Sequence, residues 1–132
     1  MKIRILLLPL LFGLLLPGIC QANDLDKLLS SLLVGSWEEG IMPYSLVSFK
    51  KDGTYLAEIY ETSLKKRRLL KMEGNWSIKN SEVHSVLTAS SSAKAPVGES
   101  FVDRIVQINQ SEIILIGVDG KQYSKFRVTP RE

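Results

Sequence analysis

Short β-rich runs bounded by turn-forming residues recur every 8–12 residues from Gly35 to the end of the chain. This spacing is typical of an all-β sandwich or barrel, because each run suits one strand and each interruption suits one turn. Short links also make neighbours in sequence neighbours in space. We predict about eight strands, which span residues 36–41, 44–50, 54–61, 68–79, 83–89, 100–109, 112–118 and 121–129.

The clearest pattern covers residues 70–79, in which apolar and polar residues alternate strictly. Gly74 on the apolar face leaves space for a neighbouring backbone or a bulky ring. Trp76 is predicted to point inward from the same face. The full apolar set is Leu70, Met72, Gly74, Trp76 and Ile78.

Asp52-Gly53 and Asp119-Gly120 predict two tight hairpins, because glycine tolerates positive φ. The first hairpin sets a register in which Phe49 lies opposite Tyr55. One face then carries Val47, Phe49, Tyr55, Ala57 and Ile59. The later strands, FVDRIVQIN and EIILIGV, have apolar residues on both faces, so their inner faces are not assigned.

Residues 1–22 are predicted to be a secretory signal peptide. Lys2 and Arg4 precede an apolar run over residues 5–16, which is shorter than the about 20 residues that span a bilayer. Cleavage is predicted after Ala22, since Cys20 and Ala22 supply the small side chains that the peptidase accepts. The alternative is a lipoprotein modified at Cys20. We expect a periplasmic or secreted protein that is not transmembrane after cleavage.

Removing this segment from the 132 residues leaves 110, which suits one domain. Lys2 and Arg4 go with it, so 15 basic residues remain against 14 acidic ones and the net charge falls from +3 to about +1. This balance does not favour nucleic acid as a partner. Cys20 is the one cysteine, so no disulfide is expected after cleavage at Ala22.

A short helix is predicted over residues 23–35, ahead of a barrel domain over residues 36–132. Asn23 or Asp24 can cap the helix and Gly35 can end it. A helix of this length is marginal alone, so we expect it to dock on the barrel; a partner-binding or membrane-surface helix is the alternative. The leucines that form its apolar face are Leu25, Leu28, Leu29, Leu32 and Leu33.

Closure into a barrel is expected because an open sheet would leave two unpaired edges that invite aggregation. The predicted fold is all-β: a small antiparallel up-and-down meander barrel of about eight strands with the short N-terminal helix packed on it. The helix that ends in GSW, the FKKDGTY hairpin, the GNW strand and the final KQYSKFRV strand together resemble the lipocalin-like, or calycin-type, barrels. These include small secreted bacterial proteins of unassigned function. The chain lacks the longer middle portion of that family.

The resemblance implies roles for Trp37 and Arg127 as residues that close the barrel. In the lipocalin pattern, the tryptophan of Gly-x-Trp sits at the closed end and an arginine of the last strand packs across it. A guanidinium on an indole face contributes about 0.5–2 kcal/mol. We expect Trp37 to plug one end and Trp76 to lie in the middle. The interior of such a barrel is either filled by side chains or open to one small ligand.

The residue types give no support for an enzyme. His84 is the only histidine, and no nucleophile elbow is present. Glu38 and Glu39 are adjacent, so they point to opposite faces of a strand and cannot share one proton. Glu39 has the parity of Trp37 and is a candidate polar anchor near the cavity, with Arg127 as its charge partner. Neither a metal site nor a cofactor is indicated.

Four successive basic residues, Lys65 to Arg68, precede the longest strand. Such a run is usually a solvated loop. The alternative is a site for an anionic partner: a lipid headgroup, a polysaccharide or an acidic protein surface.

The expected function is non-enzymatic binding of a small apolar ligand inside the barrel. The expected lining is Trp37, Phe49, Tyr55, Ile59, Met72 and Trp76. The alternative is a protein-binding module, such as a periplasmic inhibitor of a hydrolase, that acts through its loops on a filled barrel. The expected partner is therefore a small lipophilic ligand or a protein of the cell envelope.

Overall fold

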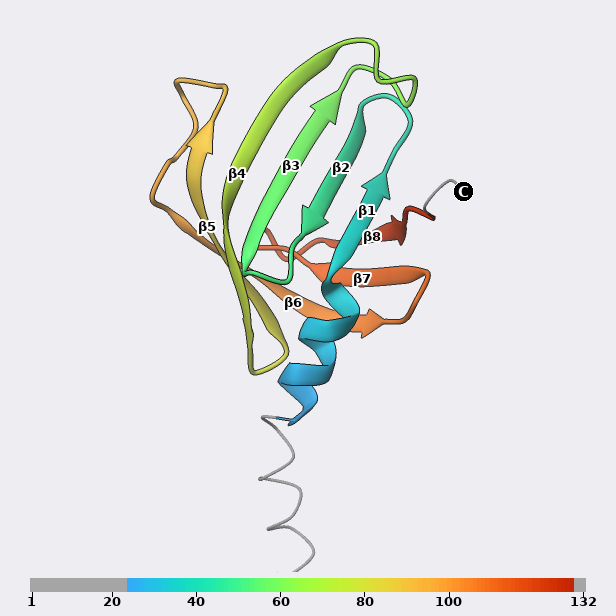
Figure 1. The fold of residues 1–132 in the computed structure, drawn as a ribbon, viewed down its shortest axis with the longest axis vertical. Coiled ribbons are helices and arrows are strands. Elements are labelled where there is room, and N and C mark those ends of the chain that lie inside the picture. Colours follow the sequence, from blue (N-terminus) through green and yellow to red (C-terminus); the bar gives the residue numbers. More distant parts are fainter. Residues whose placement is uncertain (1–23, 130–132) are drawn as a thin grey trace, which may run out of the picture.

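The chain folds into a closed, antiparallel, eight-stranded barrel, in which each strand pairs with the next and β1 pairs with β8 (Figure 1). The computed structural model describes residues 24–129. The predicted signal peptide, its cleavage site and Cys20 lie outside these residues. The strands are β1 (Gly35–Glu39), β2 (Tyr44–Phe49), β3 (Thr54–Tyr60), β4 (Arg68–Lys79), β5 (Glu82–Ser90), β6 (Ser100–Ile108), β7 (Glu112–Ile116) and β8 (Gln122–Arg127).

The predicted fold class is confirmed, and so is the register of the first hairpin. Phe49 pairs with Tyr55, and Val47 with Ala57. The last two strands are shorter than the sequence predicts. β7 ends at Ile116 because a tight turn follows, in which the Gly120 amide donates to the Gly117 carbonyl and the Gly117 amide donates to Lys121.

Residues 24–33 form the expected helix, which lies at one end of the barrel (Figure 1). Leu29 and Leu33 are buried, and Leu33 belongs to the main core. Leu25 and Leu28 are largely exposed, so only part of the leucine stripe is used for docking. The helix therefore closes an end of the barrel. No helix among the described residues is long and apolar enough to cross a lipid bilayer.

Asp26 ties the helix to the turn between β4 and β5. Its two carboxylate oxygens accept hydrogen bonds from the amides of Asn80 and Ser81, each at 3.0 Å. Both turn residues have positive φ, 54° and 61°, which directs their amides toward the helix. Charge-assisted bonds of this kind are stronger than neutral ones. They fix the angle at which the helix meets the barrel end.

The core is concentrated at the helix end. Trp37 has no exposed surface, and Leu33 and Ile113 are each 1% exposed. Val47, Val83 and Leu115 complete the buried cluster. Partly buried side chains pack around this cluster, among them Phe49, Tyr55 and Trp76. The buried core therefore lies mainly where the helix meets the barrel.

Candidate functional site

A cavity of about 210 Å³, partly open to solvent, lies in the barrel interior against the buried core, whose residues Leu33, Val47, Val83 and Leu115 line it. Its apolar wall comes from the helix and from β2, β3, β4, β5 and β7. The residues of this wall are Leu33, Val47, Phe49, Tyr55, Ala57, Met72, Val83 and Leu115. The interior is therefore neither packed throughout nor a deep cup.

The other side of the cavity is polar. Asp103 on β6, Tyr123 and Lys125 on β8, and the hydroxyls of Ser45 and Ser85 line it. Asp103, Tyr123 and Lys125 lie across the barrel from the apolar residues of β2, β3 and β4, whereas Asp103 pairs directly with Val83 and Tyr123 with Leu115. A cavity with one apolar side and a few converging polar groups has the general composition of a small-molecule site.

Asp103 and Tyr123 face each other inside this site, and the Tyr123 hydroxyl is placed to donate to the carboxylate. Burial raises the pKa of the Asp103 carboxyl above its ordinary value of 3.8, while the Tyr123 hydroxyl and Lys125 lower it in part. Burial also raises the pKa of Tyr123, helped by the charge of Asp103. Tyr123 is therefore a neutral hydrogen-bond donor at any physiological pH.

Lys125 provides the cation of the site. Its side chain is only 16% exposed, and its ammonium donates to Glu39 Oε2 at 2.9 Å. The same ammonium lies 5.6 Å from the centroid of the Tyr123 ring. Glu39 thus lies by the cavity, but its charge partner is Lys125. The prediction that Arg127 pairs with Glu39 is wrong, because Arg127 is engaged elsewhere.

Arg127 packs on Trp37 at the closed end of the barrel. Its guanidinium carbon lies 4.2 Å from the centroid of the indole, and the two residues pair across β1 and β8. Arg127 also donates to the carbonyls of Gln110 at 2.7 Å, Val34 at 2.9 Å and Leu32. Trp37 Nε1 donates to the Leu33 carbonyl at 2.8 Å.

These bonds satisfy the last carbonyls of the helix, which have no partner within the helix itself. Gly35 makes the arrangement possible, since it has a φ of +132° and a Cβ there would lie 2.5 Å from an Arg127 nitrogen. The guanidinium and the indole therefore join the helix end to the barrel floor.

The structure separates the six residues expected to line the ligand site. Phe49, Tyr55 and Met72 line the cavity. Trp37 lies in the floor, with no surface exposed to the cavity. Ile59 and Trp76 do not line it.

The prediction that Trp76 lies in the middle of the barrel is wrong. Its indole donates to the Lys50 carbonyl in the turn between β2 and β3, at 3.0 Å. The ring meets Phe49 edge-on at 5.5 Å and borders a groove beside Ser30 and Ser31 of the helix. β4 is long and extends past the cavity, so an inward residue near its end reaches the helix end of the barrel.

Glu38 and His84 lie on the outer surface. Tyr44 donates to Glu38 Oε2 at 2.6 Å, and burial together with this carboxylate raises the pKa of Tyr44 to about 12. His84 is 39% exposed and lies 4.0 Å from Glu82. Among residues 24–129, no group of three His, Cys, Asp or Glu side chains could hold a metal ion.

A larger hollow, of about 820 Å³, lies on the outer surface. Tyr44, Leu64, Lys65 and Thr129 border it. Its walls include the exposed loop between β3 and β4, whereas the interior cavity is surrounded by inward side chains of the barrel. We therefore take the interior cavity as the candidate site.

The titration of Asp103 gives the site a measurable pH dependence. Because the folded state holds this proton more tightly than the unfolded state, the free energy of unfolding should fall as pH rises above about 4, through the raised pKa. Asp103→Asn should remove this fall and still accept the Tyr123 hydrogen bond. Lys125, Asp119 and Glu39 also face this cluster, so the quantity to measure is the difference between the two proteins in urea denaturation at successive pH values. Parallel curves would contradict the burial of this carboxyl.

Sequence reasoning missed Asp103, Tyr123 and Lys125. Tyr123 and Lys125 share the parity of Arg127 on the last strand, so placing Arg127 inside already places them inside. Asp103 gives no such signal, because its strand is apolar on both faces.

The residues that mark the site are thus three polar side chains on β6 and β8 and an apolar wall that comes mainly from the helix and β2 to β5. Comparison of the chain with protein-family models and with curated proteins finds no match.

Proposed function

We propose that this chain is a secreted or periplasmic, non-enzymatic binding protein of the lipocalin-like kind, which holds one small ligand inside its barrel. The observation that carries the proposal is the interior cavity of about 210 Å³ with its two unlike sides. The packing of Arg127 on Trp37 supports the lipocalin-like resemblance, since the same contact is expected there.

The size of the cavity limits the ligand. Ligand pockets commonly measure about 300–1,000 Å³, and an apolar cavity of about 150 Å³ holds one benzene molecule. The cavity here lies between these two values. A molecule with about one ring fits it, whereas a long acyl chain does not fit inside.

The lining indicates the chemistry of the ligand. Phe49, Tyr55 and Met72 offer an apolar wall on which a ring can pack. Tyr123 and Asp103 offer a hydroxyl and a carboxyl of raised pKa on the opposite side. The ligand we propose is therefore a small ring with a neutral hydrogen-bonding group at one end, such as a phenol or an indole.

Filling the cavity tests this proposal. Ala57 lies in the wall between Val47 and Met72, so Ala57→Leu should occupy part of the void and weaken binding of phenol or indole at least tenfold. Binding is followed by titration calorimetry and by NMR shifts of the Met72 methyl group. Ala89→Leu is the matched control, because Ala89 is an exposed residue of β5 and the added atoms are the same.

Two results would contradict the proposal. One is the absence of any Met72 shift at millimolar concentrations of phenol, indole and benzene. The other is equal binding by the Ala57→Leu and Ala89→Leu proteins, which would place the ligand outside the barrel. Circular dichroism of both variants checks that the fold is retained.

A further inference from the structure

Two loops at the end of the barrel opposite the helix expose apolar side chains side by side. The β1–β2 loop carries Ile41 and Met42, which are 72% and 75% exposed. The β3–β4 loop carries Leu64, which is 72% exposed. The Ser63 amide donates to the Ile41 carbonyl at 3.0 Å and holds the loops together. Ile41, Met42 and Leu64 are called the apolar tip below.

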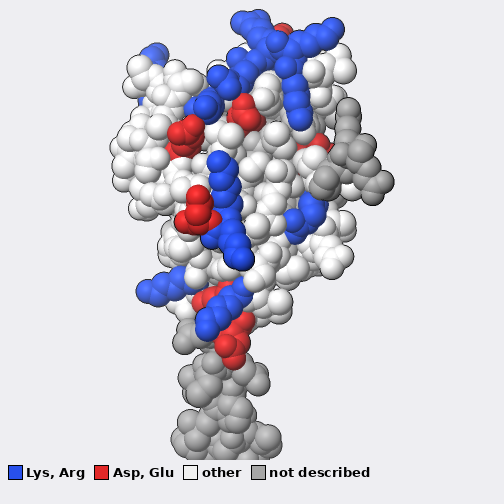
Figure 2. Space-filling model, viewed as in Figure 1, with Lys and Arg blue, Asp and Glu red and all other residues white. Residues whose placement is uncertain are grey.

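The basic run Lys65–Arg68 adjoins the apolar tip. Lysine and arginine side chains gather over this end of the molecule, where the β3–β4 loop lies (Figure 2). Arg67 is 3.7 Å from Glu61. The Lys65 ammonium lies 5.6 Å from the centroid of the Tyr44 ring.

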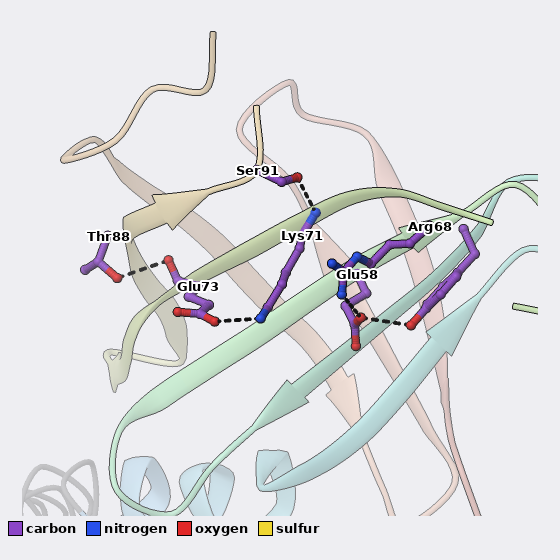
Figure 3. A network of polar contacts seen from close by, with 7 residues as sticks. Glu58, Arg68, Lys71, Glu73, Thr88 and Ser91 are labelled. Atoms are coloured by element: carbon purple, nitrogen blue, oxygen red, sulfur yellow. Dashed lines mark hydrogen bonds and ion pairs between the residues drawn. The ribbon is translucent and has the colours of Figure 1, made fainter. Parts of the chain in front are cut away.

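Arg68 has a firmer partner on the outer face of the sheet. It bonds to Glu58 at 3.2 Å, and Glu58 also accepts a hydrogen bond from Tyr60 at 2.8 Å (Figure 3). This contact fixes the start of β4. The basic run is thus anchored at one end and projects past the barrel at the other.

The charge of this region differs from that of the rest of the chain. Residues 61–68 carry four basic residues and one acidic residue, a net charge of +3. The chain from Asn23 onward carries about +1, so its remainder is about −2. The molecule therefore presents a cationic end with three aliphatic side chains projecting from it.

This composition suits a membrane surface better than a protein surface. Protein interfaces are rich in aromatic residues and poor in lysine. The apolar tip contains no aromatic residue and adjoins two successive lysines. Membrane-surface binding depends on apolar side chains that enter the headgroup region and on basic residues that contact anionic lipids.

We propose that the apolar tip and the basic run dock this end of the barrel on a bilayer that contains anionic lipid. Ile41, Met42 and Leu64 enter the headgroup region, and Lys65 and Lys66 contact the lipid phosphates. The barrel then stands with its helix end away from the membrane. This inference does not depend on the ligand proposed for the interior.

Vesicle sedimentation tests the docking surface. The protein used is the chain from Asn23 to Glu132, which contains the helix and all eight strands of the closed barrel and excludes the apolar N-terminal run. We expect it to sediment with vesicles of phosphatidylcholine mixed with phosphatidylglycerol and to stay in the supernatant with vesicles of pure phosphatidylcholine. High salt should release it, because exposed charges are screened.

Two variants remove the two parts of the surface separately. One is Ile41→Ser, Met42→Ser and Leu64→Ser; the other is Lys65→Ser, Lys66→Ser, Arg67→Ser and Arg68→Ser. Each variant should lower binding by about tenfold or more. The first loses the apolar side chains that enter the headgroup region. The second loses four basic residues, each of which contributes about fivefold near an anionic surface. Residues 41, 42 and 64–67 lie on exposed loops and Arg68 is the exposed first residue of β4, so none of these substitutions falls in the buried core.

Matched controls replace the same numbers of apolar and basic side chains outside the apolar tip and the basic run. Leu25→Ser, Leu28→Ser and Val106→Ser take away three exposed apolar side chains. The charge control takes four exposed lysines from the helix end: Lys27→Ser, Lys50→Ser, Lys51→Ser and Lys79→Ser. Full binding by both controls, with loss in both tip variants, supports the proposal.

Three outcomes would overturn it. The first is no sedimentation with anionic vesicles at low salt. The second is an equal loss of binding in the charge control, which would mean a general attraction without a docking face. The third is self-association of the protein that disappears in the Ile41→Ser, Met42→Ser and Leu64→Ser variant without vesicle binding, which would identify a second copy of the chain as the occupant.

Discussion

Replacement of Trp37 by alanine is expected to lower the free energy of unfolding by about 3–5 kcal/mol. Trp37 has no exposed surface and stands at the centre of the buried cluster. Its loss leaves a cavity, takes the donor from the Leu33 carbonyl and removes the surface on which Arg127 stacks. The lost packing, the lost hydrogen bond and the lost stacking surface all lie where the helix, β1 and β8 meet.

Urea denaturation followed by far-ultraviolet circular dichroism measures this effect. Trp76→Ala is the matched control, because the same side chain is removed from a position that is only partly buried. The control should cost about 1–3 kcal/mol, mainly from the edge-on contact with Phe49 and the bond to the Lys50 carbonyl. A loss for Trp37→Ala no larger than that for Trp76→Ala would contradict the role of Trp37 as the floor of the barrel.

The sequence allowed the barrel to be predicted because its strands have local signals. Turn-forming residues mark where strands end, and the alternation in residues 70–79 matches β4. The Asp52-Gly53 turn gave the pairing of Phe49 with Tyr55, which is a contact between neighbours along the chain. Closure followed from a physical argument about free edges rather than from any residue pattern.

The site was harder to predict because it depends on the stagger between distant strands. In the pairing of β6 with β5, Asp103 lies opposite Val83. In the pairing of β6 with β7, the next residue, Arg104, lies opposite Ile116. No local pattern on the apolar β6 specifies which of its faces turns inward. Trp76 shows the same limit, since parity predicts that it points inward but does not predict its height along the barrel.

Polar residues of the site act in pairs, whereas a strand pattern places each residue separately. Parity predicts that Glu39 lies near the cavity, but it does not predict which basic residue of β8 lies at the same height. Trp37 pairs with Arg127, so Lys125 falls two residues nearer the opposite end, where Glu39 ends β1. The register of two strands that are far apart in sequence decides this pairing.

Substitution of Gly74 by alanine is expected to destabilise the barrel by about 3 kcal/mol, at the upper end of the range for overpacking. A Cβ at this position would lie 2.5 Å from Tyr55 Cε1 and would overlap the Val86 carbonyl oxygen. The ring and the backbone both occupy the space that the missing side chain leaves. Gly74 is buried in β4 and pairs with Tyr55 of β3 and Leu87 of β5, so a movement of the strand would disturb both pairings.

A double substitution separates the two contacts. Tyr55→Leu removes the ring, so Gly74→Ala should cost less in that background than in the original protein, and the remaining cost reports the Val86 carbonyl. Ser77→Ala, an exposed position of the same strand, should change stability by less than about 0.5 kcal/mol. An equal cost of Gly74→Ala in both backgrounds would assign the whole effect to the backbone of β5. A negligible cost in the original protein would contradict both close contacts, since it would require the Tyr55 ring and the Val86 carbonyl to give way together.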